Sequence, residues 1–289
     1  MSRRIKTVLK LSPLLLPFAA LFLGGFVLAV LQSLGYFIPV PVAKGFAGGY
    51  HHLIMGAWFF ASLGFTLYVA LVSALLSVAV GTLIGYVIWK LPRQLQGLAV
   101  VYKVPLVLPH IAVAFIILIL FTQSGFIASV CHALGLIDKP AGFPMVLFAG
   151  NGLGLIMAYA YKGSAFVILM VYAILQRLDK RLLVTAQMLG ASRIETFFKI
   201  VLPHLRPILH TSFIILFLYA FGAFDIPYLL SESYPGMLSI QAYNLYFKRD
   251  LVNRPMAMGI LVVMFLFSAL FIYAYTRINM RLDSRARKL

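Results

Sequence analysis

Residues 62–89 read SLGFTLYVALVSALLSVAVGTLIGYVIW, and they contain no charged side chain. A helix needs about 20 apolar residues to cross the hydrocarbon core of a bilayer, and this run is longer than that. Within it Ser73, Ser77, Gly81 and Gly85 recur every fourth residue, so they share one helical face. Small side chains let a second helix approach closely. The run predicts a membrane span, and we favour packing inside one bundle over a subunit interface for its small-residue face.

The composition of the whole chain agrees with a membrane protein. Of 289 residues, 63% are hydrophobic and 11% charged, and the mean hydropathy is +1.00. These values lie outside the range of soluble globular domains. The excess of 24 Lys and Arg over 7 Asp and Glu does not indicate nucleic-acid binding, because the basic residues flank apolar runs. The single cysteine, Cys131, excludes an internal disulfide framework and a thiolate metal cluster.

Six apolar segments are long enough to span a membrane. They cover residues 11–34, 62–89, 104–123, 152–175, 208–230 and 256–276. The first is too long for the apolar region of a signal peptide, so we expect it to be retained. No internal repeat or soluble segment interrupts the series. The sequence predicts an all-α, polytopic membrane bundle of six transmembrane helices, in a single domain over residues 1–289.

The basic residues predict how this bundle is oriented. Eighteen of the 24 Lys and Arg lie before the first span, in the second and fourth loops, or after the last span, five lie in the other loops, and Lys162 lies within the fourth span. Positive charge is retained on the cytoplasmic side. We therefore expect a multi-pass protein with both termini cytoplasmic. The lack of glycosylation and lipidation signals fits a bacterial inner membrane.

The loop between the fourth and fifth spans carries two short amphipathic patterns. The first places Leu178, Leu182, Ala186 and Leu189 on one face, and the second uses Ile194, Phe197, Phe198, Val201 and Leu202. Between them, Gly190 suits the left-handed position that closes a helix. Ser192 and Glu195 have the spacing of a capping box, and Pro203 is expected to end the second helix. The pattern predicts a cytoplasmic helix-turn-helix.

Two roles remain open for this helix-turn-helix. It could dock into a groove on a partner protein. It could instead lie on the lipid surface, with Arg177, Lys180 and Arg181 among the headgroups. Periodicity alone does not separate the two.

The same loop resembles the EAA loop of ATP-binding-cassette (ABC) importer permeases. That motif reads Glu-Ala-Ala, three residues, Gly, nine residues, Ile, any residue, Leu-Pro. The matching positions in AQMLGASRIETFFKIVLP are Ala186, Gly190, Ile200, Leu202 and Pro203. The resemblance implies a coupling helix seated in a cleft of the ATPase subunit. Here Val184 and Thr185 replace the leading Glu-Ala, which puts one polar contact in doubt; Arg193, Glu195 or Lys199 are candidates for a substitute charge.

Further segments, including VPLVLPHIAVAF and FGAFDIPYLL, resemble permeases of the branch that contains spermidine/putrescine importers, over residues 60–280. The resemblance implies a transport subunit that works with ABC ATPase subunits, a second permease subunit (in a homodimer or heterodimer) and a periplasmic solute-binding protein. ATP and magnesium would bind to the ATPase, and this chain would hold no cofactor. A polyamine-like solute is the first hypothesis for the cargo.

Two ionisable residues lie inside predicted spans, where charge is costly and often functional. Lys162 interrupts the fourth span, and Asp225 lies near the outer end of the fifth. We favour a structural pair between them. The alternative places Lys162 and Asp225 along a substrate path with Tyr161, Tyr219 and Tyr228, where a carboxylate would attract a cation. Pro227 is expected to break the fifth helix and form a gate.

Several functions are disfavoured by what the sequence lacks. It has no phosphate-binding Gly-x4-Gly-Lys-Ser/Thr loop, no His-Glu-x2-His pair and no other metal-ligand or nucleophile-base pattern. We therefore expect neither enzymatic activity nor a metal site in this chain. A stand-alone secondary transporter or channel is the alternative function, but it would predict inverted repeats and several intramembrane carboxylates, which this sequence does not show.

Overall fold

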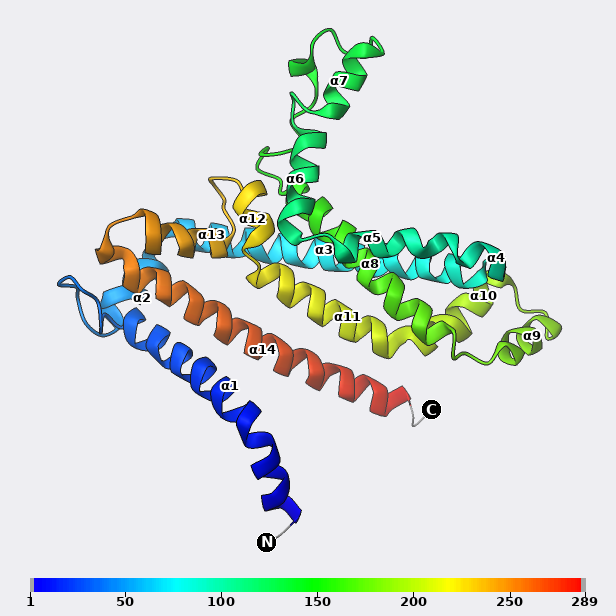
Figure 1. Cartoon of the computed structure of the whole chain (residues 1–289), viewed down its shortest axis with the longest axis horizontal. Coiled ribbons are helices and arrows are strands. Elements are labelled where there is room, and N and C mark those ends of the chain that lie inside the picture. The colour runs from blue at the N-terminus through cyan, green and yellow to red at the C-terminus, as the bar shows by residue number, and fades with distance from the viewer. Residues whose placement is uncertain (1–2, 287–289) are drawn as a thin grey trace. The chain divides into compact units, whose positions relative to one another are not determined.

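The structure, a computed structural model, describes residues 3–286, and these form helices and loops without strands. Six apolar helical segments in this range are long enough to cross a membrane (Figure 1). The helices that build them are α1 (Arg3–Ser33), α3 (Ala57–Lys90), α6 (His110–Phe121) with α7 (Phe126–Ala133), α8 (Leu153–Leu175), α10 (Arg193–Thr196) with η3 (Phe197–Val201) and α11 (Leu202–Gly222), and α14 (Arg254–Ala286). The predicted all-α, six-span architecture is confirmed.

Shorter elements connect these segments. They are α2 (Phe46–Met55), α4 (Arg93–Gln96), η1 (Leu98–Lys103), α5 (Val104–Val107), η2 (Pro140–Gly142), α9 (Lys180–Met188), α12 (Asp225–Leu230), α13 (Leu238–Tyr243), η4 (Asn244–Lys248) and η5 (Leu251–Asn253). The chain forms two compact units. The terminal unit contains Met1–Ala61 and Leu238–Leu289, and the central unit contains Ser62–Met237. That all of them belong to one permease domain stays a prediction.

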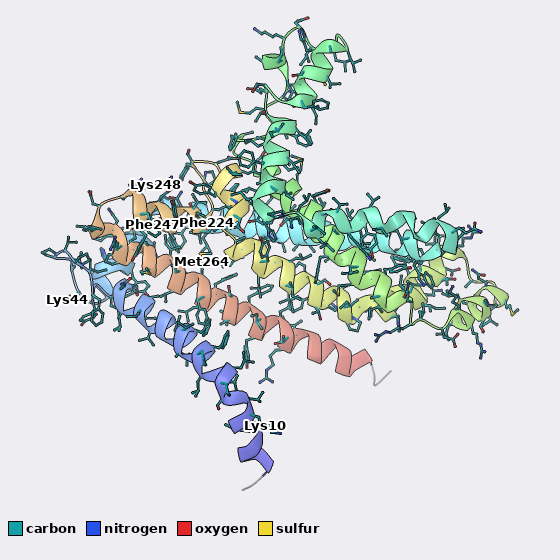
Figure 2. All side chains as sticks on the ribbon, in the orientation of Figure 1. Lys10, Lys44, Phe224, Phe247, Lys248 and Met264 are labelled. Carbon is teal, nitrogen blue, oxygen red and sulfur yellow. The ribbon has the colours of Figure 1, made fainter. Side chains whose placement is uncertain are left out.

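The terminal unit pairs the first and last spans. The Phe265 ring of α14 lies 6.0 Å from Phe22 and 4.3 Å from Phe26 of α1, measured between ring centroids. In α2, a Cβ on Gly49 would lie 2.6 Å from the Ser33 carbonyl oxygen and 2.7 Å from that of Pro255. Only glycine permits this close approach. Figure 2 shows Lys10 toward one end of α1 and Lys44 beyond its other end.

The central unit is built on close packing between α3 and α8. A Cβ on Gly81 would lie 2.5 Å from the Val167 Cβ, and one on Gly85 would lie 2.9 Å from a γ-carbon of Val171. On α8, a Cβ at Gly163 would meet the Ser77 side chain. The small-residue face of residues 73–85 therefore packs against another helix of the same chain, as the sequence predicted.

The third span departs from its predicted bounds of 104–123. Its main helix begins only at His110, because Leu108 before Pro109 is extended, with φ −65° and ψ 134°. The residue before a proline is disfavoured in the helical region. Beyond Phe121 the chain continues into α7, which together with α6 extends away from α3, α8 and α11 (Figure 1).

Two predictions about proline in the fifth span were wrong. Pro203 does not end a helix, since η3 is a π-helical turn whose C-cap Leu202 N–H bonds to the Phe197 carbonyl. This turn leads into α11, and Pro203 lies in the first turn of α11, where a missing N–H is tolerated. The break near the other end falls at Ala223, which is extended (φ −67°, ψ 147°), and Pro227 lies within the short helix α12 that follows.

We expect Gly81→Leu to destabilise the protein, because the added side chain must push α3 and α8 apart. Overpacking of this kind costs about 1–3 kcal/mol. Gly64→Leu on the same helix is the matched control, since a Cβ there has no neighbouring atom within 4 Å. Thermal unfolding of both variants in detergent checks the prediction. Equal unfolding temperatures for the two variants would contradict it.

Candidate coupling segment and central cavity

Residues 179–203, here called the coupling segment, begin with a capped helix. The Asp179 carboxylate accepts a hydrogen bond from the Arg181 N–H at 2.9 Å, which satisfies one of the free donors at the start of α9. After α9 the chain turns at Gly190, whose φ is +81°. A Cβ there would meet no atom within 4 Å. The left-handed backbone, and not crowding, therefore demands glycine, and the predicted turn is confirmed.

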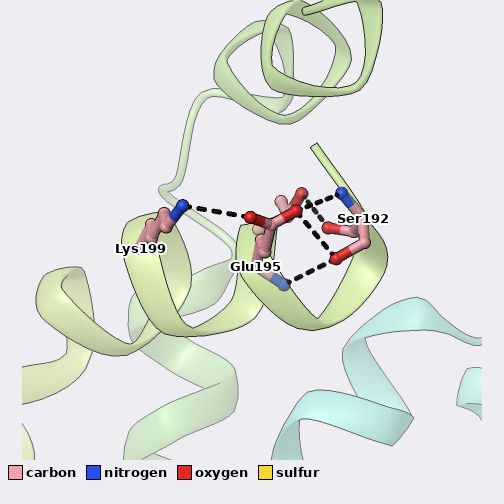
Figure 3. Close-up of polar contacts among 4 residues, drawn as sticks. Ser192, Glu195 and Lys199 are labelled. Atoms are coloured by element: carbon pink, nitrogen blue, oxygen red, sulfur yellow. Dashed lines mark hydrogen bonds and ion pairs between the residues drawn. The ribbon is translucent and has the colours of Figure 1, made fainter. Parts of the chain in front are cut away.

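The second helix of the segment opens with the predicted capping box (Figure 3). The Glu195 N–H donates to the Ser192 hydroxyl at 3.2 Å, and the Ser192 N–H donates to the Glu195 carboxylate at 2.9 Å. The other Glu195 oxygen accepts from the Lys199 ammonium at 3.1 Å. Both carboxylate oxygens therefore have partners inside the segment. Glu195 is a poor substitute for the glutamate that Val184 replaces.

The inner face of the segment is anchored in the core of the central unit. Phe197 packs on Tyr86 of α3 with ring centroids 4.8 Å apart. Val201 and Leu205, four and eight residues further on, are fully buried. They belong to one apolar cluster with Trp89, Val167, Val171, Leu175 and Leu178. The segment is therefore attached to both α3 and α8.

Six apolar side chains of the coupling segment are exposed, and we call them together its outer face. They are Leu182, Val184, Met188, Leu189, Ile194 and Phe198, and Met188 and Leu189 are each 83% exposed. Thr185 and Arg193 are also exposed, whereas the motif positions Ala186, Ile200, Leu202 and Pro203 are partly buried. So many exposed apolar side chains on one short segment indicate a contact with another protein or with lipid.

A second feature of the central unit is a cavity of about 230 Å³ between α3, α8 and α11. Each of these helices lines the cavity with one face, as the spacing of its lining residues by one, three or four positions indicates. They are Ser73, Ala74 and Ser77 on α3, Tyr159, Lys162, Gly163 and Phe166 on α8, and Ile215, Leu216 and Tyr219 on α11, together with Leu106 and His110. Below, we call it the central cavity.

Some polar groups of the central cavity have hydrogen-bond partners within the protein and others do not. Ser73 and Ser77 donate their hydroxyl hydrogens to carbonyls of their own helix, at 2.6 and 2.7 Å. The Lys162 ammonium donates to the Leu108 carbonyl, at the break before α6. The Tyr159 hydroxyl is buried and has no hydrogen-bond partner among the described residues. The His110 and Tyr219 rings pack together with centroids 4.9 Å apart.

Only two of the five predicted path residues line this cavity, namely Lys162 and Tyr219. Tyr161, Asp225 and Tyr228 lie outside its wall, and Tyr161 and Tyr228 are exposed. Lys162 and Asp225, both within the described range, form no ion pair, so the predicted pairing was wrong. The carbonyl of Leu108 takes the place of the carboxylate, because the break before Pro109 leaves it without a helical partner.

Three residues outside the predicted site residues also contribute polar groups to the central unit. Tyr159 and His110 line the central cavity, and the spacing of three residues between Tyr159 and Lys162 was the signal that could have found the tyrosine. Glu232 is 8% exposed, and its carboxylate accepts from the Gly152 N–H at 3.3 Å, at the start of α8. No local pattern links Glu232 to Gly152, 80 residues earlier.

The family described as binding-protein-dependent transport system inner membrane component matches residues 77–288. The chain belongs to this family. It is therefore the membrane-spanning permease subunit of an ABC importer, a multi-pass inner-membrane protein and not an enzyme. The match includes the coupling segment and most of the residues around the central cavity.

Curated relatives of the permease have different cargo names. This permease is 28% identical to a probable sulfate transport system permease protein, cysT, of Chlorella vulgaris, over 70% of this chain and 75% of that protein. It is 26% identical to the molybdenum transport system permease protein ModB of Azotobacter vinelandii, over 74% and 91%. It is 26% identical to the spermidine/putrescine transport system permease protein PotB of Escherichia coli, over 58% and 60%.

Solved structures of ABC importers share the fold of the permease. A chain of a bacterial transporter involved in the import of the acidic polysaccharide alginate matches with a TM-score of 0.74 and 19% identity, over 96% of this chain and 98% of that chain. A chain of the MetNI methionine transporter matches with a TM-score of 0.51 and 14% identity, over 76% and 93%. At these identities the similarity shows the fold alone.

Proposed function

We propose that this permease forms a translocation path together with a second permease subunit, that ABC ATPase subunits dock on its coupling segment, and that a periplasmic solute-binding protein delivers the cargo. ATP and magnesium bind in the ATPase subunits, and their closure moves the coupling segment. The resemblance of residues 186–203 to the EAA loop and the family membership support this proposal.

The observation that carries the proposal is that the coupling segment and the central cavity share two helices. α8 contributes Val167, Val171 and Leu175 to the cluster that anchors the segment, and Tyr159, Lys162 and Phe166 to the cavity wall. α11 likewise contributes Leu205 to the anchor and Tyr219 to the wall. Because packed helices move as rigid elements, a push on the segment reaches the cavity through α8 and α11.

We expect Leu189→Lys to abolish capture of the ATPase subunits by the permease. If the outer face of the coupling segment seats in an ATPase cleft, burying an unpaired ammonium there costs several kcal/mol, which lowers the affinity by about a hundredfold or more. If the face lies on lipid, the lysine reaches the headgroups and changes little. Copurification from membranes measures the outcome.

Leu134→Lys is the matched control for this experiment, because Leu134 is an exposed leucine of the central unit outside the coupling segment. It should retain the ATPase. Full capture by the Leu189→Lys variant would show that the outer face rests on lipid and not on the ATPase.

Gly190→Trp should uncouple ATP hydrolysis from uptake in the assembled complex. Any L-residue other than asparagine or aspartate is strained at φ +81° by roughly 1–2 kcal/mol, and the indole adds bulk beside the docking face. Gly190→Asn is the control, since asparagine visits this conformation routinely. We expect hydrolysis without solute uptake in the tryptophan variant, measured in proteoliposomes, and near-normal uptake in the asparagine variant. Unchanged transport in both would argue against coupling through this turn.

We propose that both termini and the coupling segment face the cytoplasm, on the basis of the distribution of Lys and Arg. A Cys131→Ala background allows a direct test, because the chain has no other cysteine. A membrane-impermeant maleimide should label Leu134→Cys in intact cells, and Met188→Cys only after the membrane is opened. Both parent side chains are exposed. Labelling of Met188→Cys in intact cells would reverse the assignment.

The cargo is a small solute, and polyamine is one candidate for it. The similarity to PotB and the carboxylate of Asp225 at the start of α12 support this candidate. Asp225 nevertheless lies outside the wall of the central cavity. The relatives named for sulfate and molybdenum support an oxyanion as the second candidate. Uptake assays with radiolabelled putrescine and sulfate in cells that express the whole importer would separate the two.

A further inference from the structure

The central cavity contains a group of hydrogen-bond donors that the fold leaves unused. The Tyr159 side chain is 5% exposed, lines the cavity, and its hydroxyl has no partner among the described residues. Leaving a buried hydroxyl unpaired is energetically unfavourable, because the hydroxyl has given up its hydrogen bonds to water. Such a group at the wall of a cavity is suited to bind a ligand.

Lys162 lies one helical turn from Tyr159 on the same face of α8. An ammonium has three N–H donors, and the structure uses one of them on the Leu108 carbonyl. The remaining two donors and the positive charge are available at the cavity wall. A cation inside a membrane span is expensive unless a partner compensates it, so a negative ligand would lower that cost.

The rest of the wall adds no negative charge. Apart from Lys162 and His110, the lining residues are aromatic, aliphatic, glycine or serine, and none is acidic. Its volume of about 230 Å³ is below the roughly 300–1,000 Å³ of sites for drug-sized ligands. The cavity therefore suits a small group rich in acceptors.

We infer that the central cavity binds an oxyanion group of the transported solute, with the Lys162 ammonium and the Tyr159 hydroxyl as donors. The inference rests on the proposed transport function and specifies its cargo class. A tetrahedral oxyanion or a carboxylate presents acceptors on several sides, and charge-assisted hydrogen bonds are the strong ones. His110 and Tyr219, whose rings pack against each other on the same wall, limit the space around that group.

Asp225 distinguishes this inference from the polyamine hypothesis. Its carboxylate is within electrostatic range of His110, Tyr159 and Tyr219, but it lies outside the wall. A cationic cargo needs Asp225 and is repelled by Lys162. An anionic cargo needs Lys162 and gains slightly when Asp225 is neutralised. The two hypotheses therefore predict opposite effects for the same two substitutions.

The test measures thermal unfolding of the full-length permease in lipid nanodiscs, titrated with sodium sulfate, sodium molybdate or putrescine at constant ionic strength. Sulfate raises the unfolding temperature of any protein by exclusion from its surface, so the informative quantity is a saturable shift that depends on the variant. We expect such a shift with sulfate or molybdate. Lys162→Met should raise its apparent Kd by about tenfold or more, and Lys44→Met, in the terminal unit, should leave it unchanged.

Tyr159→Phe keeps the test informative if Lys162→Met fails to fold. Removing a hydroxyl that has no partner among the described residues should not lower the unfolding temperature of the ligand-free protein. It should nevertheless raise the apparent Kd for the anion by about threefold or more. Asp225→Asn should leave the anion shift intact or strengthen it.

Two results would overturn the inference: a saturable shift with putrescine alone that Asp225→Asn removes, or an anion shift that is the same in the wild type, Lys162→Met and Tyr159→Phe. Neither result bears on ATPase capture through Leu189. A failure of the cargo assignment is therefore distinguishable from a failure of the proposed transport function.

Discussion

The contact between α3 and α8 is the interaction on which the central unit depends. At Gly81, Gly85 and Gly163 the two helices approach until no side chain fits between their backbones and the facing residues. In a bilayer the hydrophobic effect does not drive helices together. Helix association therefore depends on close van der Waals packing of this kind. The same contact sets the rotation of α8 about its axis. That rotation decides which residues of α8 face the cavity and which face the apolar cluster.

The shared use of α8 and α11 has a mechanical consequence. Both helices anchor the coupling segment with one part of their length and line the central cavity with another. The capping box at Ser192 and Glu195 and the turn at Gly190 hold the segment in a defined shape. A rigid, anchored segment with an exposed apolar outer face can transmit a force, whereas a flexible loop would absorb it.

The helix breaks of the central unit follow the constraint that backbone polar groups must be satisfied within a membrane. Irregular backbone is tolerated there only where protein or a cavity covers it. At Leu108 the free carbonyl accepts from Lys162, beside the central cavity. At the start of α8 the free N–H of Gly152 donates to the buried Glu232. Both charged groups are therefore bound to the backbone, which explains why Lys162 does not need Asp225.

The sequence by itself determined the six spans, the capped turn at Gly190 and the amphipathic pattern of residues 178–202. These features depend on hydropathy and on hydrogen bonds between residues a few positions apart, so residues close in the sequence are enough to predict them. The family could also be identified from the EAA loop, because its matching residues lie within one short stretch of the sequence. Proline effects were predicted less well, because a π-helical turn before Pro203 removed the expected helix end.

Only the tertiary structure decided how the intramembrane charges are used. The partner of Lys162 lies 54 residues away and that of Glu232 lies 80 residues away, and no periodicity encodes such distances. The same holds for the meeting of Tyr159, Lys162 and His110 at one cavity, which requires a specific rotation of α8 and the break before α6. The sequence shows that a charged side chain in a span needs a polar partner. Which group becomes that partner depends on how the helices pack.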